Sequence, residues 1–239
     1  MEEEKDMKKK VFYTEWAYVA GILTLALGTV LSEKAGFGMS MVVAPAYVLY
    51  RKLNPLWSIF TFGMAEYCFQ ALLLLVMILV IRRFRVSYLL SFATAVVYGF
   101  VLDGCMLIVS FLPADGYLFR VLWYLVGMLL CAAGVSMMFH TYISPEVYEL
   151  FVKEVSGRFK VNINRFKTCY DCASCVLGLL MSFLFFGFGT FIGVSVGTVL
   201  CALINGFLIG RFSAFYEKHW MFRDALPLRS FFEGKTRKR

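Results

Sequence analysis

The apolar positions of this chain fall in six long blocks, unlike the short alternating or amphipathic runs of soluble proteins. Each block approaches the ~20 residues that a helix needs to cross the hydrocarbon core of a membrane. No linker rich in Pro, Gly or Ser divides the blocks, so the pattern predicts one all-α polytopic membrane domain with six transmembrane helices. The predicted helices cover about residues 13–31, 58–81, 88–112, 119–139, 168–188 and 190–211.

Two shorter segments lie between these blocks at corresponding places. The segment SMVVAPAYVLYRK follows the first block and is too short to cross a membrane, so we expect a re-entrant or interfacial helix. The segment SPEVYELFVKEVSG follows the fourth block and predicts a helix over 145–156. Ser144 is its expected N-cap, Pro145 lies in its first turn, and Gly157 is its expected stop.

An internal similarity links the third and sixth predicted helices. When SFATAVVYGFVLDG (91–104) is compared with GVSVGTVLCALING (193–206), small residues coincide and recur every four positions. Such stripes let a neighbouring helix backbone approach closely. We therefore expect helix packing through Ser91, Ala95 and Gly99 in the first copy and through Gly189, Gly193 and Gly197 in the second.

The similarity predicts two three-helix repeats, each with one short helix. Because three crossings is an odd number, the second repeat should be inverted with respect to the first. The predicted organisation is an N-terminal segment, a first membrane repeat, a second membrane repeat and a basic aromatic tail, over residues 1–12, 13–112, 113–211 and 212–239. Inverted repeats with interrupted helices are typical of secondary transporters, whose binding sites lie near the membrane midplane.

The basic residues predict the orientation. Of the 24 Lys and Arg residues, only Lys34, Arg51, Lys52 and Arg120 lie on one side of the predicted topology. The positive-inside rule therefore places both termini in the cytoplasm of a cell carrying this protein in its inner or plasma membrane. The net charge of +8 then reflects topology, and we expect the tail to lie on anionic lipids. No basic soluble face is present for a nucleic acid.

Polar residues inside the predicted helices are the candidate site. Asp103 ends the stripe of the third helix, Asn205 aligns with it in the sixth, and Glu66 and Asp171 occupy similar places in the helices before them. Ionisable side chains are costly in hydrocarbon and usually functional there. These four residues predict an interior site for a substrate or a proton. The alternative for Asp103 is a hydrogen bond that only joins two helices.

Other chemistry is less well supported. His140 ends the fourth helix and is either a polar residue at headgroup depth or part of a proton relay. Cys169, Cys172 and Cys175 are spaced so that a helix spreads them around its circumference, and we expect no metal site there. The GFGTFIG stretch lacks the spacing of a dinucleotide fingerprint. The spans contain no cluster of His with carboxylates and no activated nucleophile, so we expect neither an enzyme nor a cofactor.

Several motifs resemble those of the YczE/YitT-like bacterial integral membrane proteins. They are GTVLSEKAGFGMSMVV, SPEVYEL, NRFKTCYDC and GVSVGTVLCALINGFLIG, within residues 16–212. The resemblance implies a multi-pass membrane protein with an acidic residue at the position of Asp103. The GMSMV stretch departs from the turn that the resemblance implies. The biochemical role of these proteins is largely undefined.

Three classes of function fit these patterns. The first is a small secondary transporter or permease for a polar or ionisable solute. The second is the substrate-capture subunit of a vitamin uptake complex, and the third is a regulatory membrane partner that transports nothing. The expected partners are the lipid bilayer and a small solute, and a homodimer is an open alternative.

Overall fold

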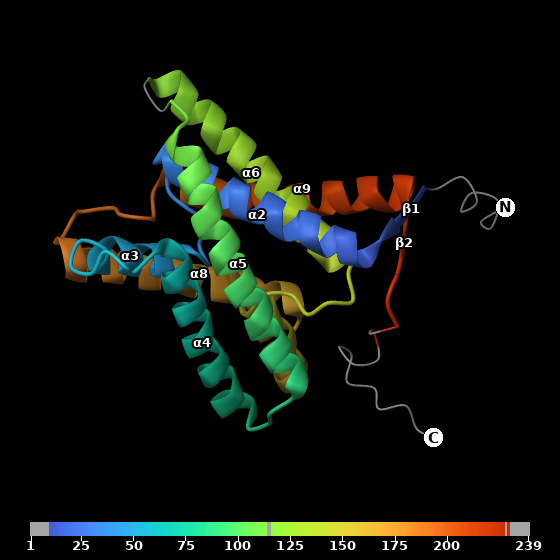
Figure 1. Ribbon diagram of the computed structural model, residues 1–239. Coiled ribbons are helices and arrows are strands. Elements are labelled where there is room, and N and C mark those ends of the chain that lie inside the picture. Colours follow the sequence, from blue (N-terminus) through green and yellow to red (C-terminus); the bar gives the residue numbers. More distant parts are fainter. Residues whose placement is uncertain (1–9, 114–115, 228, 230–239) are drawn as a thin grey trace.

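The computed structural model describes residues 10–113, 116–227 and 229, which form eight helices and one pair of short strands (Figure 1). Six of the helices are long and apolar enough to cross a membrane. The prediction of six transmembrane helices is therefore confirmed by length and composition. The six are α2 (Thr14–Ala35), α4 (Phe62–Ile81), α5 (Val86–Ser110), α6 (Tyr117–Phe139), α8 (Ile163–Phe186) and α9 (Val196–His219).

Helices α2 and α6 form the most extensive pair and run antiparallel through four glycines. Gly21 lies against Gly134, and Gly28 lies against Gly127. A Cβ atom added to Gly28 would come within 2.6 Å of the Cys131 backbone nitrogen and 2.7 Å of the Gly127 carbonyl oxygen. The two backbones therefore touch, and only glycine fits between them.

The remaining long helices pack around this pair. Helix α5 packs against α2, and α9 packs against α6 (Figure 1). Helix α4 pairs with α5, where Gly99 meets the carbonyl oxygen of Gly63. Ser91 and Ala95 are fully buried, and the Ser91 hydroxyl donates to the carbonyl oxygen of Pro145. The stripe of small residues on α5 therefore faces other helices of the bundle along its length.

Two short helices, α3 (Ala44–Leu53) and α7 (Val147–Phe159), each pack against both α4 and α8. Helix α7 packs on α4: the Val147 backbone N–H donates to Gln70 at 3.0 Å. Helix α3 packs on α8, and Lys52 near its end donates to the carbonyl oxygen of Phe185 at 3.1 Å. Both short helices are thus part of the bundle.

The expected limits of α7 need correction. Glu146, rather than Ser144, is the N-cap residue, because the first helical bond runs from the Leu150 N–H to the Glu146 carbonyl oxygen. The carbonyl oxygens of Ser144 and Pro145 accept instead from hydroxyl groups of α5. The helix also continues through Gly157 and ends at Phe159, where Lys160 takes the left-handed conformation with φ 54°. Gly157 has open space around it and no special backbone angle, so nothing stops the helix there.

The sixth span is shifted along the chain from its predicted position. Helix α9 begins at Val196, where Ser195 and Thr198 form a capping box, and it continues to His219. Gly189 and Gly193 therefore lie in the preceding loop with φ of 88° and 77°, and the prediction that they form a helical stripe is wrong. Glycine-dense sequence favours a loop here.

The first residues of the predicted tail are also ordered. Residues 212–219 complete α9, and β2 (Trp220–Arg223) then pairs in parallel with β1 (Lys10–Tyr13). The Glu15 carboxylate accepts backbone N–H bonds from Ala225 and Leu226 at 2.9–3.1 Å. The two ends of the described chain are thus joined beside α2. Residues 230–239 of the tail lie outside the described residues.

We expect Gly28→Ala to destabilise the protein by about 1–3 kcal/mol, because the added methyl group must push α2 away from α6. Thermal unfolding of the purified protein measures this loss. Gly104→Ala is the matched control, since a Cβ on that helical glycine meets nothing within 4 Å. An equal effect of the two substitutions would contradict the close packing of α2 and α6.

Candidate functional site

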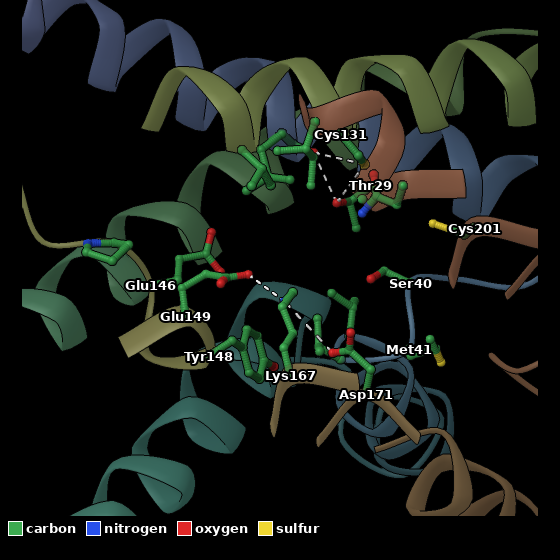
Figure 2. Close-up of a pocket in the computed structure, with 18 of the residues that line it drawn as sticks. Thr29, Ser40, Met41, Cys131, Glu146, Tyr148, Glu149, Lys167, Asp171 and Cys201 are labelled. Carbon is green, nitrogen blue, oxygen red and sulfur yellow. Dashed lines mark hydrogen bonds and ion pairs between the residues drawn. The ribbon is translucent and has the colours of Figure 1, made fainter. Parts of the chain in front are cut away.

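A cavity of about 330 Å³ lies among the helices, at the lower end of the size range of small-molecule sites. Helices α2, α5, α6, α8 and α9 contribute to its wall, and so do the beginnings of α7 and the segment before α3. Both halves of the chain therefore surround it. Among the polar residues that line it are Glu146, Tyr148, Glu149, Lys167 and Asp171 (Figure 2).

One cation and two carboxylates form the charged side of this cavity. Lys167 Nζ donates to Glu149 Oε1 at 3.0 Å and lies 3.9 Å from Asp171 Oδ1 (Figure 2). Lys167 and Asp171 are one turn apart on α8, and Glu149 comes from the first turn of α7. Because Lys167 lies between two acidic groups, these three side chains together carry one net negative charge when all are ionised.

Three acceptor oxygens in the cavity wall lack a hydrogen-bond partner among the described residues. They are buried oxygens of Glu146, Asp171 and Asn205. An unsatisfied buried polar group costs about 1–3 kcal/mol. A bound solute with N–H or O–H groups would relieve this cost, so the cavity is suited to a donor-rich ligand.

Of the four polar residues that the sequence predicts as a site, Asp171 and Asn205 lie together in the cavity wall. Glu66 does not line it, but is fully buried beside the start of α7. Glu66 accepts from the Tyr148 hydroxyl at 2.9 Å, and Tyr148 does line the cavity. Glu66 is thus connected to the cavity through the side chain of Tyr148.

Asp103 belongs to α5 and does not line the cavity, and its side chain contacts the beginning of α4. Its carboxylate accepts the Gly63 backbone N–H at 2.8 Å and the Thr61 hydroxyl at 2.6 Å. Thr61 is itself the N-cap residue of α4. A carboxylate in this place satisfies free N–H groups and favours the positive end of the helix dipole. The geometry favours the packing alternative for Asp103.

His140 is also outside the cavity, at the end of α6. Its Nε2 lies 3.0 Å from the Ser213 hydroxyl, and its ring stacks on Phe222 with 4.7 Å between centroids. Burial lowers the pKa of His140 below its usual value. These contacts join α6 to α9 and β2, so His140 has a structural environment in which it is mainly neutral.

The sequence did not point to Glu146, Glu149 and Lys167. In the sequence, Glu146 and Glu149 lie on the polar side of an amphipathic segment, and Lys167 is one of many basic residues on the predicted cytoplasmic side. The available signal was their position, at the start of a short helix and at the start of the following span. Among the described residues, no group of three or more His, Cys, Asp or Glu side chains is placed to hold a metal ion.

Comparison with known proteins gives a family but no activity. A family model, described as a family of unknown function (DUF6198), matches residues 12–214. No curated protein matches the chain, and no solved structure matches it. The match covers all six membrane-spanning helices apart from the end of α9.

The substitution Asp103→Asn separates the two roles considered for this residue. We expect a loss of about 0.5–2 kcal/mol in stability, as for other helix caps, because the amide can accept only through one of its two groups. We also expect any ligand-induced rise in melting temperature to be kept. Unchanged stability with loss of that rise would instead make Asp103 part of a binding site.

Proposed function

The chain belongs to the family of unknown function DUF6198, and we propose that it is a small secondary transporter for a polar solute that carries an amine. The supporting observation is the cavity, which lies within a bundle of six membrane-spanning helices and carries unpartnered acceptor oxygens and one net negative charge. Such a site inside hydrocarbon is costly to maintain without a ligand.

The packing of the helices supports an inverted repeat. Gly21 and Gly28 of α2 are each 106 residues before Gly127 and Gly134 of α6, and the contacts Gly21–Gly134 and Gly28–Gly127 exchange under this correspondence. Two further pairs of contacts follow the same rule: α2 packs on α5 as α6 does on α9, and α3 packs on α8 as α7 does on α4. The contact of α4 with α5 has no equivalent of comparable extent between α8 and α9. Two copies related by a two-fold axis in the membrane plane would give this pattern.

The short helices support a site at the centre of the repeat. The segment before α3 and the beginning of α7 both reach the cavity. Each helix then runs away from the cavity along a long helix, towards Phe185 in one case and towards Arg85 in the other. Half-helices that begin at a central site are a recurring feature of transporters built from inverted repeats.

The charges support the choice of an amine. The basic side chain that lines the cavity, Lys167, already donates a hydrogen bond to Glu149. The unpartnered groups are acceptors: two carboxylate oxygens and one amide oxygen. A primary amine brings three donors and a positive charge to such a set. The YczE/YitT-like resemblance remains a prediction, and it names no solute.

A thermal-shift screen of the purified protein tests this function. We expect small amines and amino acids to raise the melting temperature, and carboxylic acids of similar size without an amine to have no effect. Asp171→Asn should weaken the binding of the stabilising amine about tenfold or more, because a charged hydrogen bond contributes ~1.5–3 kcal/mol. Asp224→Asn is the control, since Asp224 pairs with Arg229 and does not line the cavity. Stabilisation by acids alone would contradict the proposal.

Orientation is tested by labelling single cysteines with a membrane-impermeant reagent in intact cells. We propose cytoplasmic termini, so cysteines placed at Arg85 and Arg158 should be protected from the reagent and one at Lys52 should react. Arg239, which the predicted topology places inside, and Asp115, which it places in the second external loop, lie outside the described residues. Reaction at position 158 from outside would overturn the orientation.

A further inference from the structure

Two buried carboxyl groups, Glu66 of α4 and Glu146 at the start of α7, are joined by one amide. Gln70 Nε2 donates to Glu146 Oε2 at 3.3 Å and lies 3.5 Å from Glu66 Oε2. Glu66 is 0% exposed and Glu146 is 7% exposed. In each carboxyl group the second oxygen is buried and has no partner among the described residues. The Gln70 amide and the Tyr148 hydroxyl therefore reach only two of the four carboxyl oxygens.

No cation faces this pair in the part of the chain that the structure describes. The titratable groups that act on it come from all the surrounding helices and are neutral or acidic: Tyr18 of α2, Tyr98 of α5, Cys131 of α6, Tyr148 and Glu149 of α7 and Tyr170 of α8. The nearest basic side chain in the cavity, Lys167, pairs with Glu149 and Asp171 instead.

The pair also lies deep in the bundle. Gln70 is eleven residues before the end of α4 at Ile81, or about 16 Å along the helix axis. This places Gln70 near the middle of a hydrocarbon core of about 30 Å. Two ionised carboxylates without a counter-ion at this depth would combine the cost of desolvation with mutual repulsion.

We propose that Glu66 and Glu146 form a proton-binding site, in which at least one of the two carboxyl groups is protonated while the donors Gln70 and Tyr148 hold both groups in a fixed hydrogen-bond network. Burial, and then the neighbouring Glu66, raise the pKa of Glu146 to about 8. The folded protein thus binds more protons than the unfolded chain between about pH 4.5, the ordinary value, and pH 8, and it loses stability as the pH rises through that range.

The site connects the proton to the position of α7. Gln70 donates to both carboxyl groups through its amide nitrogen and accepts the Val147 backbone N–H through its oxygen. Release of the proton leaves two like charges on either side of Gln70, which pushes the start of α7 away from α4. Because Glu146 and Tyr148 at the start of α7 line the cavity, proton release changes the cavity wall. The role of this pair in coupling proton movement to transport rests on the proposed function. The claim that the pair binds a proton does not.

Infrared spectroscopy of the purified full-length protein tests the proton site without any solute. Protonated carboxyl groups have a C=O stretching band that ionised ones lack. We expect wild-type protein to show such a band at neutral pH, and to lose it as the pH rises through about 8. Labelling glutamate with ¹³C at the side-chain carboxyl should shift the band, which assigns it to Glu rather than Asp without any substitution. A spectrum with no titrating Glu band would overturn the proposal.

Substitutions then assign the band to the pair. Glu66→Gln combined with Glu146→Gln should remove the band. Glu154→Gln should leave it, because Glu154 of α7 forms an ion pair with Arg85, which precedes α5. A band that survives the double substitution would also overturn the proposal. If the double variant does not fold, each single substitution should shift the pH at which the remaining band is lost to a lower value, since the neighbouring charge is gone.

Hydrogen exchange measures the movement of α7. Between about pH 6 and about pH 9, exchange over residues 144–156, corrected for the intrinsic effect of pH, should rise at least severalfold in the wild type. It should not rise in Glu146→Gln, which keeps the hydrogen bonds of a neutral side chain. Equal exchange at both pH values in the wild type would contradict the link to α7. A proton site without amine-induced stabilisation would refute the proposed function and leave this site standing.

Discussion

The structure depends on the contact of α2 with α6, where two helix backbones touch through glycines. In a membrane, apolar side chains gain nothing from leaving the lipid, so helices associate by close packing and hydrogen bonds. Gly21, Gly28, Gly127 and Gly134 allow that packing over two turns of each helix. Three other long helices are then placed from this pair: α5 on α2, α9 on α6, and α4 on α5. The fourth, α8, packs on the short helices α3 and α7. The cavity is the space left between these helices and α8.

Most buried polar side chains in the described part of the bundle are satisfied by other protein groups. Asp103 caps the start of α4, Ser91 and Thr94 bond the carbonyls of Pro145 and Ser144, and Tyr98 bonds Thr29. These contacts fix helix ends and loops where no water competes. Most of the exceptions gather at the cavity or behind its wall, in Glu66, Glu146, Asp171 and Asn205. Their concentration is the reason to treat this region as functional.

The six spans could be predicted from the sequence because length and apolar composition suffice in hydrocarbon. The start of α9 could not, because the apolar block runs without a break through the loop at Gly189 and Gly193, and only the Ser195–Thr198 capping box marks where the helix begins. The sequence indicates a candidate site through the polar residues inside the predicted spans. This criterion identifies Asp171 and Asn205, but it selects Asp103 equally. Which polar residue caps a helix and which faces a cavity depends on helix rotation, and one sequence does not determine that. Glu146 was missed for a different reason: the amphipathic pattern of α7 is the same for a helix on a membrane surface as for one between long helices.

The two pairs of carboxyl groups, Asp171 with Glu149 and Glu66 with Glu146, differ in the groups that surround them. Asp171 and Glu149 have Lys167 between them, so a basic side chain compensates part of their charge. Glu66 and Glu146 have only neutral donors, so they are more stable with a proton. Glu149 and Glu146 belong to the same end of α7, and a displacement of that end changes both sites at once. A positive solute beside Asp171 would favour ionised Glu146 across the cavity, and a proton on Glu146 would remove part of the field that holds the solute. Proton and cationic solute would therefore compete for the cavity, which is the arrangement that exchange of one for the other requires.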